Sequence, residues 1–121
     1  MATKTTKRPK KAPSLPKIRT LREAMHMPRK TFSRLIGFSE RAVAGWESGN
    51  QSLNELAERR LHELERLQEG LKSVVSGDAI PAWINTPNQA FDGLKPLEVI
   101  ERGETDRLWQ MIFMLESGVA S

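Results

Sequence analysis

Residues 28–49, PRKTFSRLIGFSERAVAGWESG, predict two short helices separated by a tight turn. Pro28 suits the first position of a helix, because the N–H that it lacks would have no partner there. Gly37 suits the left-handed residue that commonly ends a helix, and Ser39 suits the N-cap of the next one. Gly49 is expected to end that second helix. The spacing therefore predicts a helix–turn–helix unit.

Helical spacing continues on both sides of this unit. Upstream, Ile18, Leu21 and Met25 recur at intervals of three or four residues. Downstream, Ser52 to Glu55 has the S-x-x-E pattern of a capping box, which predicts the start of a long helix that ends near Gly77. The apolar stripe expected on this helix consists of Leu56, Leu61, Leu64, Leu67, Leu71 and Val74 or Val75.

Prolines and glycines divide residues 78–121 into short helices. The expected helix starts are Pro81, Pro87 (capped by Thr86) and Pro96, and the expected helix ends are Gly93, Gly103 and Gly118. A last helix is expected over residues 106–116, with Leu108, Ile112 and Leu115 facing the core. No segment has the sustained alternation of a strand. The fold class expected is therefore all-α.

Composition excludes several classes of protein. The chain has 121 residues and no cysteine, so we expect one domain or two very small ones, without disulfides or thiolate metal sites. Its histidines, His26 and His62, have no ligand spacing, so no metal is expected. The longest apolar run, Met111 to Leu115, is far shorter than the roughly 20 residues of a membrane helix. Neither a Ser/His/Asp set nor a phosphate-binding glycine loop is present, so neither catalysis nor a cofactor is expected.

The net charge of +4 conceals a gradient along the chain. Residues 1–17 carry six basic and no acidic side chains, whereas residues 78–121 carry three basic and seven acidic ones. The gradient suggests two separate tasks, of which only the first suits a polyanion. We expect residues 1–17 to form a disordered arm, because they contain three prolines and almost no large apolar side chains. The basic cluster of this arm, either a solubilising tail or a nucleic-acid contact, is Lys7, Arg8, Lys10 and Lys11.

The turn and the end of the second predicted helix carry a family resemblance. The matching residues are Gly37-Phe38-Ser39, Val43, Trp46, Glu47 and Gly49. Through them, residues 18–62 resemble the Xre/Cro-like family of phage-repressor-type DNA-binding domains. Two positions depart from the family pattern: Phe32-Ser33 replaces the usual Leu-Ala, and Pro28-Arg29 replaces a Ser-Gln whose Gln binds a phosphate. The resemblance implies that the helix after the turn is a recognition helix for the major groove of DNA.

That helix is expected to present one face to DNA and to bury the other. The outward-facing residues, from their positions, are Glu40, Arg41, Ala44, Gly45 and Ser48. Arg41 is the candidate for base recognition, because bidentate Arg–guanine contacts are the most common specific pairing. Glu40 suits a cytosine amino group or no base, and Gly45 is either tolerated without a function or a point of close approach to DNA. The phosphate candidates are Arg29, Lys30 and Ser39, the expected core residues are Phe32, Ile36, Val43 and Trp46, and Glu47 is expected in an internal ion pair or cap.

Residues 80–118 carry a second set of motifs at fixed offsets. The matching residues are Trp83-Ile84, Thr86-Pro87-Asn88, Ala90-Phe91, Gly93, Pro96-Leu97-Glu98, Gly103, Leu108, Leu115 and Gly118. This segment resembles the toxin-binding domain of the MbcA/ParS/Xre antitoxins, with Ile84 and Phe91 in place of leucines. The residues that the resemblance assigns to the toxin-binding module are Trp83, Pro87, Asn88, Gly93, Pro96, Trp109, Gly118 and Ser121. Among them, Trp109 is either a contact anchor or a core residue.

Together the resemblances imply an antitoxin of a type II toxin–antitoxin system. Its usual partner is a RES-domain toxin, which consumes NAD or modifies proteins with ADP-ribose, and residues 78–121 would cover the active-site cleft of that toxin. Residues 18–77, an Xre/Cro-like helix-turn-helix bundle with its long helix, would bind a palindromic double-stranded DNA operator as a homodimer and repress the operon.

The implied setting is the bacterial cytoplasm, in association with the nucleoid and not with a membrane. The main alternative is a stand-alone dimeric transcription regulator that has no toxin partner. A purely structural adaptor would leave the basic N-terminal part and the outward-facing helix unexplained.

Overall fold

The computed structural model describes residues 15–118 and contains only helices over that range. The absence of strands among these residues confirms the all-α fold class expected from the sequence. The α-helices are α1 (Leu15–Ala24), α2 (Arg29–Ile36), α3 (Glu40–Ser48), α4 (Glu55–Lys72), α5 (Ile80–Ile84), α6 (Pro96–Glu101) and α7 (Thr105–Ser117), and the 3-10 helices are η2 (Gly77–Ala79) and η3 (Gln89–Phe91). Because α1 begins at Leu15, the segment expected to be a disordered arm, residues 1–17, overlaps the first turn of a helix.

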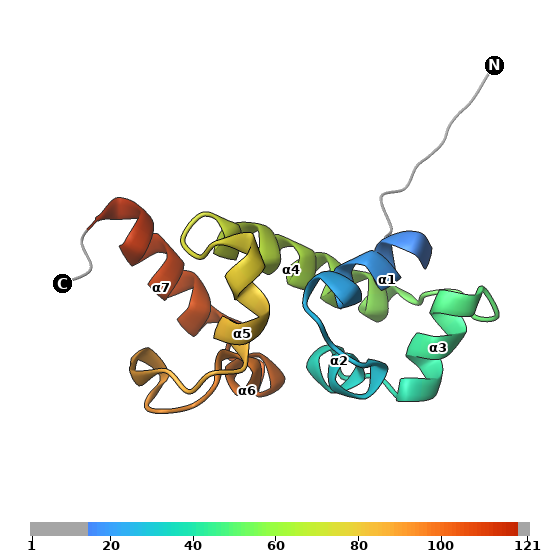
Figure 1. The fold of residues 1–121 in the computed structure, drawn as a ribbon. Coiled ribbons are helices and arrows are strands. Elements are labelled where there is room, and N and C mark those ends of the chain that lie inside the picture. The colour runs from blue at the N-terminus through green and yellow to red at the C-terminus, as the bar shows by residue number, and fades with distance from the viewer. Residues whose placement is uncertain (1–14, 119–121) are drawn as a thin grey trace, which may run out of the picture.

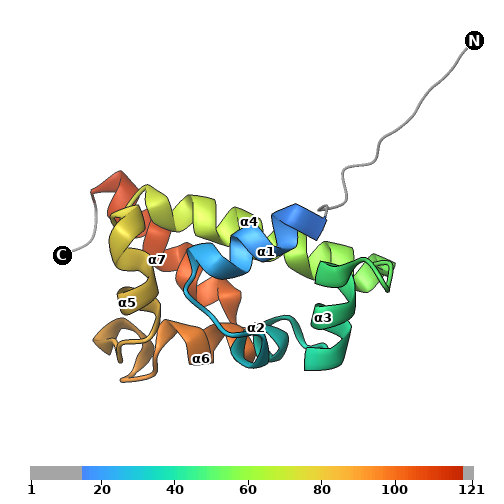
Figure 2. The ribbon, with the colours of Figure 1, turned by 45° about the vertical axis from the view of Figure 1, so that its right-hand side comes forward.

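Helix α4 runs along the length of the molecule and connects its two ends (Figure 1). Helices α1, α2 and α3 form the front end, with α1 lying beside α4, and helices α5, α6 and α7 form the back end (Figures 1 and 2). Helix α3 contacts α1 and α2, whereas α7 contacts α4 and α6. Contacts between α2 and α6 also join the two ends directly. With its 18 residues, α4 is about 27 Å long.

The turn between α2 and α3 has the geometry that the sequence predicts. Gly37 is left-handed, with φ 75° and ψ 30°, and its N–H donates to the carbonyl oxygen of Ser33 at 2.9 Å. Ser39 is the N-cap of α3, and its hydroxyl accepts a hydrogen bond from the Ala42 N–H at 3.0 Å. Gly49, with φ 89°, ends α3. Local signals therefore account for both sides of this turn.

Two helix starts differ from the expectation. Pro28 is the N-cap of α2 rather than its first residue, and its carbonyl oxygen accepts from the Phe32 N–H at 3.1 Å. Helix α4 is capped by Asn54, whose side-chain oxygen accepts from the Ala57 N–H at 2.8 Å. The expected capping box at Ser52 to Glu55 is therefore wrong, because an asparagine closer to the helix already satisfies the free N–H group.

The buried face of α4 is also offset by one residue at its start. Leu56, expected in the apolar stripe, is 42% exposed, whereas the neighbouring Ala57 is fully buried. One residue corresponds to about 100° around a helix, so only one of the two can share the buried face. That face consists of Ala57, Leu61, Leu64, Leu67 and Leu71. The helix ends at Lys72 rather than near Gly77, which instead begins η2.

The short helices of the back end begin at two of the three expected prolines. Pro81 lies in the first turn of α5, and Pro96 is the first residue of α6. The third expected start, Pro87, is wrong, because the following residue, Asn88, caps η3 through its side chain. Thr86 is not a helix cap either, since its hydroxyl donates to a carbonyl oxygen of α5 at 2.6 Å.

Helix α7 is one residue longer at each end than the expected range of 106–116. Leu108 and Ile112 are buried as expected, but Leu115 is 45% exposed, so its expected inward position is wrong. The last turn of α7 lies at the edge of the molecule, beyond the buried face that Leu108 and Ile112 provide (Figure 1).

One cluster of buried apolar side chains extends through both ends of the molecule. At the front end, the expected core residues Phe32, Ile36, Val43 and Trp46 are all buried. At the back end, the cluster includes Ile84, Phe91, Val99, Leu108 and Ile112. The buried face of α4 belongs to the same cluster, so this helix contributes to the core of both ends.

Candidate functional site

The outward face of α3 carries the residues expected to meet DNA. Positions 40, 41, 44, 45 and 48 lie along one side of a helix because they recur at intervals of about four residues. Glu40, Arg41 and Ser48 are exposed, and Ala44 and Gly45 are half-buried. The opposite side of α3, with Val43 and Trp46, is buried. The structure therefore brings these five candidates together on one accessible surface.

The three phosphate candidates have different surroundings. Lys30 is exposed near the start of α2. Arg29 is half-exposed, and its Nε donates to the Glu47 carboxylate at 3.0 Å, so it has an internal partner as well as access to solvent. Ser39 is exposed and uses its hydroxyl to cap α3. All three lie near the N-terminal end of α2 or of α3.

Glu47 is the centre of an ion-pair cluster that connects three helices. Its carboxylate, with its side chain only 1% exposed, accepts hydrogen bonds from Arg22 of α1 at 2.6 and 3.1 Å and from Arg29 of α2 at 3.0 Å. Arg19 Nε lies 4.0 Å from the same carboxylate. The expected internal ion pair at Glu47 is thus confirmed, and it holds α1, α2 and α3 together.

The same contacts change the acidity of the groups involved. Burial raises the pKa of Glu47, but the hydrogen bonds from Arg22 and Arg29 lower it more, so the pKa lies below its ordinary value. The hydrogen bond with Glu47 raises the pKa of the Arg22 guanidinium. Both shifts favour the charged forms, so the cluster is ionised at neutral pH.

Gly45 has a packing role that the sequence does not reveal. A Cβ atom at this position would collide with the side chain of Gln51. The N–H groups of Asn50 and Gln51 also donate to the Gly45 carbonyl oxygen, at 2.9 and 3.1 Å. A side chain at position 45 would therefore displace the Gln51 side chain from its place against α3.

Three of the residues assigned to the toxin-binding module contribute to the structure of the back end itself. The Trp83 ring lies edge-on to Phe91, with centroids 6.5 Å apart. Asn88 caps η3, and Pro96 is buried at the start of α6. The exposed members of the set, to which no such packing applies, are Pro87, Gly93 (φ 87°) and Gly118 (φ 74°, the C-cap of α7). The remaining candidates Ser121, Lys7, Arg8, Lys10 and Lys11 lie outside the described residues.

Trp109 combines the two roles that the sequence left open. Its ring packs against α4 so closely that a Cβ atom at Gly70 would lie 2.8 Å from Trp109 Cζ3. The side chain is nevertheless only half-buried, and its ring lies 6.1 Å from that of Phe113. Trp109 therefore attaches α7 to α4 and also borders an exposed surface.

The exposed surface next to Trp109 is an apolar one that the sequence analysis missed. Phe113, Met114 and Leu115, here called the α7 tip, are 62%, 50% and 45% exposed. They lie at the end of the molecule opposite α3 (Figures 1 and 2). The sequence does contain a signal for this surface, because residues 108–115 include no charged side chain. A helical segment that is apolar on all sides cannot bury every side when it lies at the edge of a small bundle.

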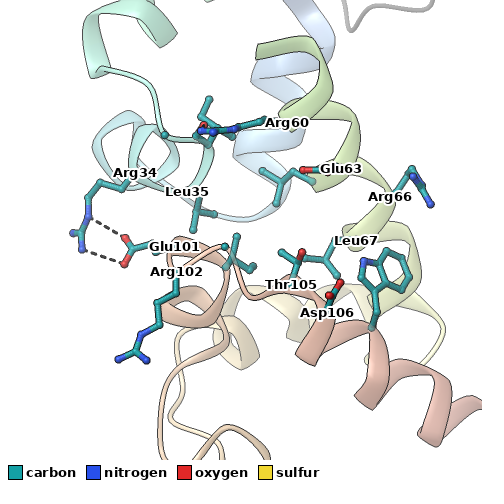
Figure 3. A pocket seen from close by; sticks show the side chains of 16 residues that line it. Arg34, Leu35, Arg60, Glu63, Arg66, Leu67, Glu101, Arg102, Thr105 and Asp106 are labelled. Atoms are coloured by element: carbon teal, nitrogen blue, oxygen red, sulfur yellow. Dashed lines mark hydrogen bonds and ion pairs between the residues drawn. The ribbon is translucent and has the colours of Figure 1, made fainter. Parts of the chain in front are cut away.

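A cavity of about 450 Å³ lies where α2, α4 and the connection between α6 and α7 meet (Figure 3). At its edge, Arg34 Nε of α2 lies 2.9 Å from Glu101 Oε2 of α6. Glu101 Oε2 has no hydrogen-bond partner, but Arg34 Nη2 donates to Glu101 Oε1 at 3.3 Å, so the two side chains form an ion pair with one hydrogen bond. Arg60 of α4 also borders the cavity and donates from Nη1 to the Ile36 carbonyl oxygen at 2.8 Å.

Within residues 15–118, no group of three or more His, Cys, Asp or Glu side chains is arranged to hold a metal ion. None of the helices described there is both long enough and apolar enough to cross a membrane.

Comparison with known proteins defines the class of this fold. No protein-family model matches the chain. The fold is shared with a chain of the solved MbcT–MbcA toxin–antitoxin complex of Mycobacterium tuberculosis, at a TM-score of 0.68 and 25% identity. The match covers 86% of this chain and 94% of that one, so the all-helical architecture described above is that of an antitoxin fold.

Sequence comparison leads to a particular relative. The mycobacterial cidal antitoxin MbcA, from Mycobacterium tuberculosis and Mycobacterium bovis, is 29% identical to this chain over 85 residues. The aligned region covers 70% of this chain and 75% of MbcA. The two comparisons together show that the chain is homologous to MbcA, as the motifs in residues 80–118 suggested. The expected roles in DNA binding and in binding a RES-domain toxin stay predictions.

Proposed function

We propose that this chain is the antitoxin of a type II toxin–antitoxin system and that it also represses its own operon. The observation that carries the proposal is its homology to MbcA, in sequence and in fold, over most of both chains. We propose further that its partner is a RES-domain toxin that consumes NAD or modifies proteins with ADP-ribose. The motifs shared with the MbcA/ParS/Xre toxin-binding domain support that assignment.

The front end supports a role in binding double-stranded DNA. Arg41 is exposed on the outward face of α3, where a guanidinium group could contact a guanine in the major groove. Lys30 and Arg29 at the start of α2 supply positive charge for phosphates, and the ion-pair cluster at Glu47 holds α2 and α3 in a fixed relation. Two copies with their α3 helices about 34 Å apart would match a palindromic operator.

The α7 tip supports a role in binding the toxin. Exposed aromatic and methionine side chains are typical anchors of protein interfaces. The acidic balance of residues 78–121 suits the basic, phosphate-binding cleft expected of such a toxin. The tip does not suit the operator-binding homodimer, because it lies at the end of the molecule opposite α3 (Figures 1 and 2).

The DNA role is tested with the full chain and the duplex upstream of its own reading frame. Arg41→Ala should weaken binding by about 1–3 kcal/mol and reduce the preference over a scrambled duplex. Lys30→Ala should weaken binding to both duplexes equally. Arg102→Ala is the matched control, because it removes an exposed arginine at the back end. It should change the affinity for neither duplex. Equal losses of Arg41→Ala on operator and scrambled DNA would refute its role in base recognition.

The toxin role is tested by co-expression with the product of the neighbouring reading frame, scored by growth and by co-purification. The double variant Phe113→Ser, Met114→Ser should lose toxin binding and protection while it keeps DNA affinity. Gln110→Ser, which changes an exposed polar residue on the same helix, should keep both. If the double variant protects cells as well as the unchanged chain, the α7 tip is not the toxin-binding surface.

The same experiments distinguish the alternative function. A stand-alone dimeric regulator would bind the upstream duplex with the Arg41 dependence described above but would neither bind nor neutralise the neighbouring product. Both functions place the protein in the bacterial cytoplasm with the nucleoid.

A further inference from the structure

Arg60 of α4 contacts the turn between α2 and α3 in two ways. Its Nη1 donates a hydrogen bond to the carbonyl oxygen of Ile36, the last residue of α2, at 2.8 Å. Its guanidinium carbon lies 5.8 Å from the centroid of the Phe38 ring, which is within cation–π range. One side chain thus binds both the end of a helix and the residue at the middle of the turn.

The hydrogen bond to Ile36 has a clear electrostatic reason. The last carbonyl groups of a helix have no partner within the helix and carry partial negative charge. A guanidinium group at this end satisfies one of them and favours the helix dipole. Arg60 therefore stabilises the point at which α2 stops and the turn begins.

Gly37 provides the space that Arg60 occupies. A Cβ atom at Gly37 would collide with Arg60 Nη1, so a side chain here would displace the guanidinium. The left-handed backbone of Gly37, at φ 75°, separately disfavours other residues. The glycine of the turn is thus required both by its backbone conformation and by the arginine from α4.

The contact continues from the turn into α3. The Phe38 ring lies edge-on to the ring of Trp46, with centroids 5.3 Å apart and an angle of 66° between the planes. Trp46 is buried on the inner face of α3, directly opposite the outward face that carries Arg41. Arg60, Phe38 and Trp46 therefore form a continuous series of contacts from α4 to α3.

We propose that Arg60 is a positioning residue for DNA recognition: by holding the turn, it sets the placement of α3 against the rest of the molecule. The inference rests on the proposed DNA-binding function. Arg60 is half-buried beside the cavity between α2, α4 and α6 (Figure 3), and its guanidinium contacts Ile36 and Phe38, so we expect it to act through the turn. Lysine would not replace it fully, because a single ammonium group cannot match the planar fork that reaches Ile36 and Phe38 together.

The test compares Arg60→Gln with the full unchanged chain in binding to the upstream duplex and to a scrambled duplex of the same length. The upstream duplex should be bound about tenfold more weakly, since a displaced α3 loses base contacts. Affinity for the scrambled duplex should change less than twofold, and the log–log salt slope should be unchanged, because no phosphate contact is removed. The affinity of Arg60→Lys for the upstream duplex should lie between those of the unchanged chain and Arg60→Gln. Arg66→Gln, the same charge loss on the same cavity wall, should behave like the unchanged chain.

A second measurement detects the displacement itself. In two-dimensional 1H–15N spectra of Arg60→Gln, the Trp46 indole and the amides of residues 37–41 should shift, while the Trp83 and Trp109 indoles should not. If Arg60→Gln does not fold, Arg60→Lys is measured in its place. Unchanged discrimination between the duplexes in the folded variant overturns the inference. Equal binding of both duplexes by the unchanged chain instead overturns the proposed function on which the inference rests.

Discussion

Arg22 and Glu47 are 25 positions apart in the sequence and are joined by two hydrogen bonds, from Arg22 Nε to Glu47 Oε2 at 2.6 Å and from Arg22 Nη2 to Glu47 Oε1 at 3.1 Å. The planar guanidinium matches the carboxylate with two parallel donors, which is the strongest geometry for such a pair. Because Glu47 is buried, its charge depends on these bonds and on that from Arg29. One carboxylate thus connects α1 and α3 in addition to their apolar packing.

Replacing this carboxylate should destabilise the whole chain. Glu47→Gln removes the negative charge but leaves Arg22 and Arg29 in place, so we expect a loss of about 3 kcal/mol in the free energy of unfolding. Urea unfolding followed by circular dichroism measures it. Glu69→Gln, which breaks an exposed pair with Lys72, should cost less than about 1 kcal/mol. Similar losses for the two variants would show that the cluster does not contribute as described.

The lowered pKa of the Glu47 carboxylate predicts how the free energy of unfolding depends on pH. The folded pKa of Glu47 lies below the value of about 4.3 expected in the unfolded chain. The carboxylate therefore contributes stability above about pH 4.3, and this contribution is lost as the pH falls through the folded pKa. Unfolding curves of the unchanged chain and of Glu47→Gln should thus converge as the pH is lowered from 7 to 3. Parallel pH profiles would contradict the lowered pKa.

Alanine substitutions at two glycines with nearly equal φ values distinguish the cost of backbone strain from the cost of a steric clash. Gly37 and Gly103 have φ values of 75° and 78°, but only at Gly37 would a Cβ atom meet another side chain, that of Arg60. Gly103→Ala should therefore cost about 1 kcal/mol of stability, the backbone strain alone, and Gly37→Ala about 2 kcal/mol or more. In the Arg60→Gln background the difference should disappear. Equal costs in the unchanged background would mean that Arg60 moves away freely.

Leu67 tests whether the two ends of the molecule share a core. Leu67 is buried on α4, so Leu67→Ala should lower the free energy of unfolding by about 2–5 kcal/mol. The folded indole signals of Trp46 at the front end and Trp83 at the back end should disappear at the same urea concentration. Leu56→Ala, on the exposed side of the same helix, should cost less than about 1 kcal/mol. Separate midpoints for the two tryptophans would show two independent cores.

The parts of the structure that the sequence predicts are those set by neighbouring residues. The left-handed Gly37, the cap at Ser39 and the end of α3 at Gly49 each depend on a few adjacent positions. The inward residues of α2 and α3 follow equally from helical spacing. These local preferences also made the outward face of α3 predictable, because a helix with one side buried presents the other to solvent.

The parts that the sequence does not predict depend on contacts between distant segments. Asn54 and Ser52 are both good caps, and the packing of α4 decides which one is used. Arg60 has no motif of its own, and its role becomes visible only once α4 lies beside the α2–α3 turn. Helical spacing predicts an inward Leu115, but the last turn of α7 lies at the edge of the molecule and Leu115 is 45% exposed (Figure 1).

The shared core has a consequence for how the protein fails. Because one buried cluster supports both the α3 face and the segment that carries the α7 tip, damage to α4 would remove both surfaces in a single event. If the two ends unfold together, as the shared cluster predicts, the proposed operator binding and toxin binding would be lost together. On the proposed function, a cell would then lose operon repression and toxin neutralisation together, so that renewed transcription and toxin release would coincide.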